Sequence, residues 1–206
     1  MVQTNIPAVS QNDQSASENA VSQNQGVASS PSQNDNSLNN FKAPLDRTSE
    51  RVTKKPFGIY ITSDTSPVQP ERFRGYHTGT DFEIFSEELN SDISVKAVCS
   101  GKILLKKYVS GYGGVVVEMC ELENNPIAII YGHLKLSSIS LEEGNLINAG
   151  DILGILGKGD SAETDGERKH LHLGFHKGMG VNVQGYVSSE SDLSKWLDPC
   201  DYICLD

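Results

Sequence analysis

Four of the five histidines in this chain lie in three short stretches whose spacing suits a metal ion. Side chains alternate between the two faces of a β-strand, so His170 and His172 point to the same face. Residues four apart share a face on a strand or a helix, so His77 and Asp81 also converge on one point. His133 stands alone between these two stretches. The pattern predicts that these side chains meet at one site.

Two imidazoles and one carboxylate would give a metal ion three protein ligands. Zinc with three protein ligands and a fourth position open to water is the usual catalytic arrangement, whereas structural zinc sites are closed by four ligands. The cysteines here lack the spacing of a zinc finger. Alternation alone allows His170, His172 or both to bind the metal. The competing interpretation is a set of histidines satisfied by hydrogen bonds in a β core.

The elements that must position these residues are predicted to be strands. Beyond residue 55 the chain consists of short apolar or alternating runs separated by glycine, asparagine and proline, which is typical of an all-β domain. The predicted fold is a small barrel-sandwich or antiparallel sheet domain, punctuated by glycines, over residues 49–206. Only residues 192–197 are expected to be helical. We expect strands at residues 57–61, 80–85, 93–98, 102–109, 115–120, 127–131, 152–156, 171–175 and 181–186.

The first 48 residues differ from the rest in composition. Before residue 48 there is a single aromatic side chain, Phe41, among serine, asparagine and glutamine. Such a segment buries too little apolar surface to offset the entropy of ordering it, so we predict a disordered linker over residues 1–48. The alternative is a cap that docks on the domain. A Ser-Gln-Asn unit recurs at residues 10–12, 22–24 and 32–34.

The charge distribution excludes some classes of partner. The formal net charge is −10. Residues 1–48 contain four acidic and two basic residues, so most of the negative charge lies in the rest of the chain. An acidic domain without basic clusters is a poor ligand for nucleic acid or an anionic membrane surface. There is no apolar stretch of about 20 residues that would span a bilayer, and the first thirty residues lack the regions of a signal peptide. We therefore expect a soluble chain, and whether an export signal preceded it stays open.

Four cysteines do not by themselves indicate a compartment. A hairpin of residues 101–109 and 114–120 would place Cys120 opposite about position 104 rather than Cys99, so we expect no disulfide between these two residues. Buried free thiols are the preferred interpretation, with a Cys200–Cys204 disulfide as the alternative.

Three motifs in this order resemble those of the lysostaphin-type zinc metallopeptidases, enzymes that cut peptide bonds in bacterial peptidoglycan. They are His77-x3-Asp81, Tyr131-Gly132-His133-Leu134 and His170-Leu171-His172. The resemblance covers about residues 74–203. It extends to glycine-marked segments at Val95–Gly101, Gly111–Gly113 and Glu143–Gly154.

The resemblance implies that His77, Asp81 and His172 ligate Zn²⁺, while His133 and His170 stay off the metal and act in catalysis. Zinc lowers the pKa of bound water from about 15.7 to about 7 and polarises the scissile carbonyl. One neutral imidazole would accept the proton of that water and the other would stabilise the oxyanion, in an order that stays open.

Tyr131 is a further candidate donor to the transition state. It shares a strand face with His133 by the two-residue rule, and a packed core tyrosine is the alternative. The loop 157–169 departs from the family, because it is charged where relatives have a small, polar run and a proline. Its charges either set substrate preference or form a solvated face. His176 is expected to be an exposed strand end.

We therefore predict a zinc-dependent endopeptidase that acts on peptidoglycan peptides, in their stems or cross-bridges, outside the cytoplasm of a bacterium. The periplasm, the cell surface and the medium are all compatible with this prediction. Two alternatives come from other classes: a non-catalytic wall-binding module that regulates other wall hydrolases, and a phosphoryl-carrier domain. The first typically lacks the ligands that this chain retains, and the second does not need the His-x-His pair or the aspartate.

Overall fold

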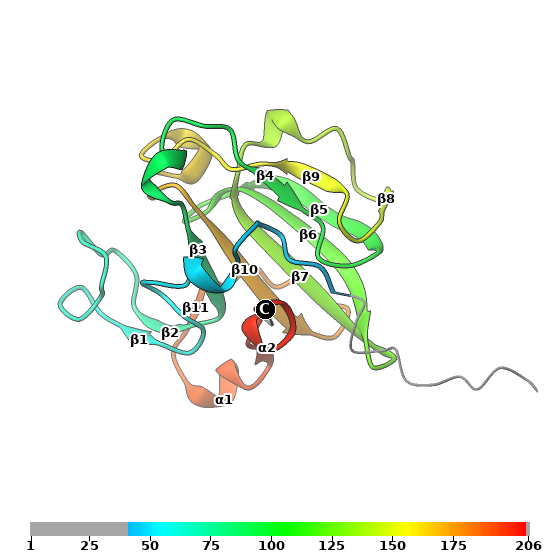
Figure 1. Ribbon diagram of the computed structural model, residues 1–206. Helices are drawn as coiled ribbons and strands as arrows, with labels where there is room; N and C mark the ends of the chain where they lie inside the picture. Colours follow the sequence, from blue (N-terminus) through cyan, green and yellow to red (C-terminus); the bar gives the residue numbers. More distant parts are fainter. Residues whose placement is uncertain (1–40, 205–206) are drawn as a thin grey trace, which may run out of the picture. The chain divides into compact units, whose positions relative to one another are not determined.

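A computed structural model describes residues 41–204 of the chain. The largest element is a seven-stranded antiparallel sheet in the order β12-β10-β7-β6-β5-β8, in which β3 pairs with the same edge of β10 as β12. Figure 1 shows its long strands β5, β6, β7 and β10. The predicted all-β class is confirmed. The strands of this sheet are β3 (Gly79–Glu83), β5 (Gly101–Val109), β6 (Gly113–Leu122), β7 (Asn125–Leu134), β8 (Leu146–Ile147), β10 (His170–Lys177) and β12 (Trp196–Leu197).

The described residues also form two smaller sheets and several short helices. One sheet consists of β1 (Tyr60–Ile61), β2 (Gly75–His77) and β11 (Tyr186–Val187), and the other of β4 (Ser94–Lys96) and β9 (Ile152–Ile155). None of the helices in this part of the chain is long and apolar enough to cross a membrane. The helices are η2 (Ser49–Arg51), η3 (Ser86–Glu88), η4 (Leu136–Ser138), η5 (Ala162–Thr164), α1 (Glu190–Leu193) and α2 (Cys200–Ile203).

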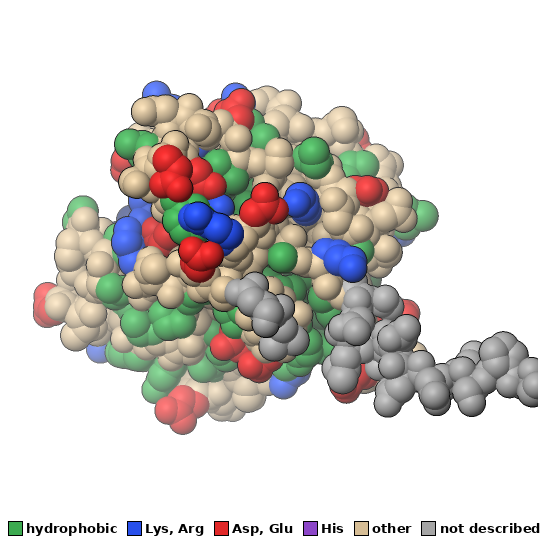
Figure 2. Space-filling model, in the orientation of Figure 1, with side chains coloured by type: hydrophobic (Ala, Val, Ile, Leu, Met, Phe, Trp, Pro, Cys, Tyr) green, Lys and Arg blue, Asp and Glu red, His purple; other side chains and the backbone are tan. Residues whose placement is uncertain are grey.

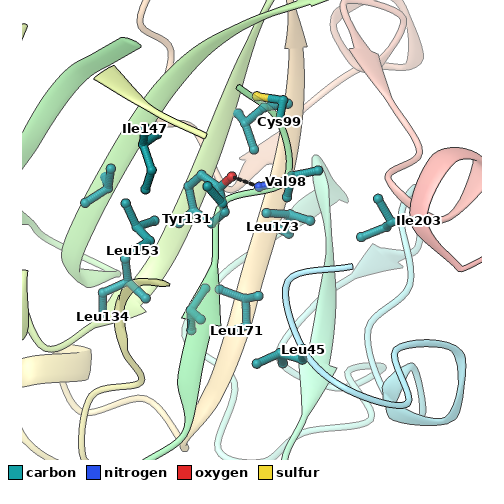
Figure 3. Close-up of a cluster of buried hydrophobic side chains, with 14 of the residues drawn as sticks. Leu45, Val98, Cys99, Tyr131, Leu134, Ile147, Leu153, Leu171, Leu173 and Ile203 are labelled. Atoms are coloured by element: carbon teal, nitrogen blue, oxygen red, sulfur yellow. Dashed lines mark hydrogen bonds between the residues drawn. The ribbon is translucent and has the colours of Figure 1, made fainter. Parts of the chain in front are cut away.

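The core follows from the alternation of side chains along the long strands. On β10, Leu171, Leu173 and Phe175 are fully buried in the main hydrophobic cluster, so the histidines at the positions between them point to the opposite face. Figure 3 shows Leu171 and Leu173 in this cluster together with Tyr131 of β7. The apolar half of β10 therefore fixes which side chains face the candidate site.

Most of the predicted strands are confirmed, and the errors lie in the shortest elements. Residues 181–186 form a strand only at their end, where β11 begins. Residues 192–197 contain the end of α1 and the whole of β12 rather than one helix, because Trp196 pairs with His176 on β10. The two-residue strands β8 and β12, and the three-residue strand β2, are too short to show a period of two in the sequence.

The predicted linker meets the domain earlier than expected. Residues 1–40 lie outside the described residues. Residues 41–48 contact the β domain: Leu45 is only 2% exposed in its core, Lys42 N donates to Val98 O at 2.7 Å, and Lys96 N donates to Pro44 O at 2.9 Å. Residues 41–48 therefore pack with the domain, and the extent of the linker stays a prediction.

All four cysteines form disulfides, which corrects the prediction of free thiols. Cys99 bonds to Cys120, and Cys200 bonds to Cys204. The register was misjudged because the hairpin turns earlier than expected, with Val109 paired with Gly113, and because a β-bulge between Ile103 and Leu105 shifts the β5–β6 pairing by one further residue. Lys102 consequently pairs with Met119, which brings the chain just before β5 alongside Cys120.

Glu118 is a fully buried acid in the centre of β6. Its Oε2 accepts a hydrogen bond of 2.7 Å from the Tyr131 hydroxyl, which itself accepts one of 2.8 Å from Val98 N (Figure 3). Burial raises the pKa of Glu118 to about 7, although the bond from Tyr131 acts in the opposite direction. The carboxyl group is thus more easily protonated in the folded chain than in water.

This raised pKa makes stability fall as pH rises. Between the ordinary pKa of 4.5 and about 7 the folded chain holds more protons at Glu118 than the unfolded chain does, so the free energy of unfolding decreases across this range. The shift corresponds to about 3 kcal/mol. We expect Glu118→Gln to exceed wild type in urea-unfolding free energy at about pH 8 and to lose that advantage near pH 4.5. Parallel pH profiles for the two proteins would contradict this expectation.

Candidate metal centre

The pairing of β3 with β10 brings the predicted site residues together. Asp81 and His172 are direct partners across the two antiparallel strands, and His77 ends β2 just before β3 begins. Gly79 makes the approach close enough, because a Cβ at this position would lie 2.7 Å from His172 Nε2. His77, Asp81 and His172 are all buried.

Three atoms of these residues form a compact triangle. Asp81 Oδ1 lies 3.2 Å from His77 Nε2 and 3.1 Å from His172 Nδ1, and the two nitrogens are 3.1 Å apart. Tetrahedral zinc with bonds of about 2.0–2.1 Å would separate its ligands by roughly 3.3 Å, so the donor set and its size fit this ion.

A second grouping of potential ligands among the described residues does not suit a metal. It consists of Cys99, Glu118 and Cys120. Its two cysteines are joined in a disulfide, so neither offers the thiolate that binds metals. The triangle of His77, Asp81 and His172 is therefore the better metal centre.

His77 and His170 each have one ring nitrogen that points away from the triangle and donates a hydrogen bond to a backbone carbonyl. His77 Nδ1–H donates to Pro56 O at 3.2 Å, and His170 Nδ1–H donates to Arg168 O at 2.9 Å. Each bond leaves Nε2 as the unprotonated nitrogen of a neutral ring. His77 Nε2 belongs to the triangle, and His170 Nε2 lies 3.2 Å from Asp81 Oδ2.

His133 stands next to His170 at the edge of the triangle, with 4.2 Å between the ring centroids. Burial and the neighbouring His170 hold the pKa of His133 well below its ordinary value of 6.5, and burial lowers the pKa of His172 to about 4. Burial alone would raise the pKa of Asp81, but His170 and His77 lower it well below 3.8. At neutral pH His133 and His172 are therefore uncharged, and Asp81 is ionised.

The structure places Tyr131 in the core and not at the site, which corrects its prediction as a transition-state donor. Its hydroxyl is used by Glu118 and Val98. The two-residue rule fails because His133 has a left-handed backbone with a φ of 64°, next to a register shift in the β6–β7 pairing. The side chains of Tyr131 and His133 therefore do not share a face.

Tyr112 occupies the place that was predicted for Tyr131. It is buried, and its hydroxyl oxygen lies 3.1 Å from His172 Nε2. Sequence reasoning assigned residues 111–114 to a turn and missed this side chain. The signal that could have found it is an aromatic residue set between glycines, where small neighbours leave room for a ring. Gly132 supplies such room, because a Cβ there would lie 2.8 Å from Tyr112 Cε1.

A second aromatic residue that the sequence did not reveal supports His77. The ring of Tyr186 lies 5.1 Å from that of His77 and stacks on Phe73 at 5.3 Å. The Tyr186 hydroxyl accepts a hydrogen bond of 3.1 Å from the buried Lys55, whose charge is balanced by Glu71 at 2.5 Å. These contacts fix one wall of the site.

Four charged residues of the loop 157–169 are bound within the domain, so the prediction of a solvated face is wrong for them, whereas Lys158 and Asp160 are exposed. Glu167 accepts from Arg72 Nε at 2.8 Å, and Asp165 accepts from the backbone of Gly111 at 2.6 Å. Lys169 Nζ donates to the carbonyl of Ser91 at 2.5 Å, and Arg168 reaches Asp81. The loop thereby joins the turn before β6 to the metal centre.

The site opens into a cleft of about 360 Å³. No histidine is visible on the face drawn in Figure 2, where acidic and basic side chains are interspersed. His176 lies on the same face of β10 as His170 and His172. Its ring packs against Trp196, with 4.7 Å between the ring centroids, and it is not part of the site. The cleft is lined by Asp81, Tyr112, His133, His170, His172 and Tyr186, among others.

The domain is all-β and brings His77, Asp81 and His172 together beside a cleft that Asp81 and His172 line. The model of Peptidase family M23 matches residues 75–184, more than half of the chain, and these residues include all six predicted site residues, Tyr131 among them. The chain therefore belongs to Peptidase family M23.

The chain is also similar to individual known proteins. Endolysin 2638A of Staphylococcus phage 2638A is 35% identical over 100 residues, which are 48% of this chain and 18% of the endolysin. The chain thus spans less than a fifth of that relative.

Two solved structures share the fold at a TM-score of 0.50. LytU is 24% identical, with 74% of this chain and 83% of that chain covered. A chain of the SpoIIQ-SpoIIIAH pore forming complex is 18% identical, with 81% and 92% covered. At these identities the likeness concerns the fold alone.

The close packing of Tyr112 on Gly132 makes this glycine sensitive to any side chain. We expect Gly132→Ala to destabilise the domain by about 1–3 kcal/mol, because the added methyl group overlaps a buried ring that has little room to move. Urea unfolding measures this cost. Gly180→Ala is the matched control, since a Cβ there meets nothing within 4 Å. Equal losses in both variants would contradict the packing argument.

Proposed function

We propose that this chain is a zinc-dependent endopeptidase that hydrolyses peptide bonds in peptidoglycan stems or cross-bridges. One observation carries the proposal: the ligand triangle of His77, Asp81 and His172 lies beside two further histidines, His133 and His170, at a cleft that Asp81, His133, His170 and His172 line. Membership of a family of zinc metallopeptidases supports the metal. The likeness to a phage endolysin supports a substrate in the bacterial cell wall.

The three ligand residues would hold zinc through His77 Nε2, Asp81 Oδ1 and His172 Nδ1. Bound zinc would supply a Lewis acid and lower the pKa of water to about 7. With Nδ1 of His172 engaged, its Nε2 carries the proton and donates to the hydroxyl oxygen of Tyr112. This contact keeps the imidazole oriented toward the centre.

We assign the general base to His170. Its Nδ1–H is committed to the carbonyl of Arg168, so Nε2, which lies 3.2 Å from Asp81 Oδ2, is the nitrogen that would accept the proton of the attacking water. His133 lines the cleft beside it and offers the N–H of a neutral ring to the oxygen of the scissile carbonyl, where negative charge develops. After the attack, His170 returns its proton to the leaving amine.

The alternative of a non-catalytic module is less well supported. The fold is shared with a chain of the SpoIIQ-SpoIIIAH pore forming complex, so the fold alone does not imply hydrolysis. The retained ligands and the tautomers set by Pro56 and Arg168 favour an enzyme, since a purely structural domain does not require them.

The proposed site of action is outside the cytoplasm, where the peptidoglycan substrate lies. Two disulfides support this location, because such bonds persist in oxidising compartments and are rare in reducing ones. The periplasm, the cell surface and the surrounding medium all meet this condition.

Substitution of a ligand and of the base should have separable effects. We expect His172→Ala to lose near-stoichiometric zinc together with activity, because two ligands hold the ion poorly. We expect His170→Ala to keep zinc and to lose about 10²–10⁴-fold in rate, the usual contribution of a general base. Metal analysis and mass spectrometry of fragments released from purified peptidoglycan measure the two effects.

His176→Ala is the matched control, because His176 lies on the same face of β10 but contacts Trp196 instead of the ligand triangle. It should keep both zinc and product. Equal product from wild type and His172→Ala would refute the site. Zinc binding without product from walls of several chemistries would favour the regulatory module.

A further inference from the structure

The loop before β10 places a buried arginine against the outer oxygen of a metal ligand. Arg168 Nη2 donates to Asp81 Oδ2 at 2.9 Å, and the same guanidinium contacts Glu83, with Nε at 3.0 Å from both carboxylate oxygens. The side chains of Arg168, Asp81 and Glu83 are 16%, 3% and 10% exposed. The guanidinium therefore bridges two largely buried carboxylates.

The two oxygens of Asp81 face different partners. Oδ1 points to the ligand nitrogens of His77 and His172, at 3.2 and 3.1 Å. Oδ2 points to Arg168 and to His170 Nε2, at 2.9 and 3.2 Å. A carboxylate that is free to rotate can offer one or both oxygens to a metal, whereas one held at Oδ2 can offer only Oδ1.

We infer that Arg168 is a positioning residue that selects the oxygen of Asp81 offered to the metal and holds that carboxylate in place for single-atom ligation. The inference rests on the proposed function, since it concerns the zinc ligand set. A planar guanidinium suits this task, because its donors have a fixed geometry and engage two carboxylates at once.

The fold explains how Arg168 is held. Glu83 lies two residues beyond Asp81 on β3, so both carboxylates share a strand face, and Glu83 pairs across the sheet with His170. Arg168 precedes His170 by two residues and thus reaches both. Glu83 also offsets the positive charge that Arg168 would otherwise place beside a cation. This pairing makes the burial of the arginine tolerable.

Arg168 is also linked to the proposed base, because its carbonyl oxygen accepts from His170 Nδ1 at 2.9 Å. Its side chain thus orients a ligand while its backbone orients a catalytic imidazole. The loop 157–169 acquires a defined role in this way.

A charge-preserving double variant tests the inference. Arg168→Met with Glu83→Gln removes the guanidinium together with one of the two carboxylates that it bridges, so the net charge is unchanged. We expect the zinc dissociation constant, measured by chelator competition, to rise about 10–100-fold, the usual effect of losing a group that orients a ligand. We also expect the visible spectrum of the cobalt-substituted protein to change, because Asp81 gains freedom to rotate.

The matched control is Arg72→Met with Glu167→Gln, an ion pair of 2.8 Å that involves the same loop and does not touch Asp81. It should keep the wild-type zinc affinity and cobalt spectrum. Circular dichroism checks that each variant is folded. If the double variant does not fold, Arg168→Lys gives the test, because one ammonium cannot hold both carboxylates. It should weaken zinc binding in the same direction.

Wild-type zinc affinity and an unchanged cobalt spectrum in the folded variants would overturn the inference. An increase in KM for wall peptides with unchanged zinc binding would also overturn it, since Arg168 would then contact substrate. Failure of wild type to bind zinc would instead overturn the proposed function. The two failures are therefore distinguishable by the metal titration of wild type alone.

Discussion

The register between β3 and β10 is the constraint on which the rest of the site depends. It sets Asp81 directly opposite His172. A slip of one residue would turn every side chain of β10 to the other face, placing the histidines in the core and Leu171, Leu173 and Phe175 in the cleft. The burial of these three apolar side chains opposes such a slip. Hydrophobic packing on one face of the strand therefore determines metal geometry on the other.

The ligand triangle is prepared by contacts on the far side of each ligand. His77 is held through Nδ1 by the Pro56 carbonyl, and Asp81 through Oδ2 by Arg168. His172 meets the Tyr112 hydroxyl at Nε2. Each of the three residues thus has one ligand atom left to point into the triangle. Its other polar side-chain atom is hydrogen-bonded, so its burial is not costly. Such preorganisation explains how a loop, a turn and three strands can define one site.

The sequence was informative where long strands alternate regularly and failed where the backbone departs from that pattern. Alternation predicts that His170 and His172 share a face, and the family resemblance divides their roles. The same rule misplaced Tyr131, because the left-handed residue His133 and the nearby register shift break the alternation. The disulfide assignment failed because the turn between β5 and β6 comes earlier than predicted and the bulge in β5 shifts the register further. Tyr112 and Arg168 escaped notice because they act from a turn and a loop, where spacing carries no periodic signal.

Two of the three proposed ligands, Asp81 and His172, are supported by the loop 157–169. This support limits which changes in the loop the site can tolerate. Arg168 contacts Asp81 directly, while Asp165 binds the backbone of Gly111, beside the Tyr112 that contacts His172. His77 is held separately, by Pro56 and Tyr186. A change in the loop that alters substrate preference must therefore preserve both contacts. Loss of either contact would disturb a proposed metal ligand, Asp81 or His172.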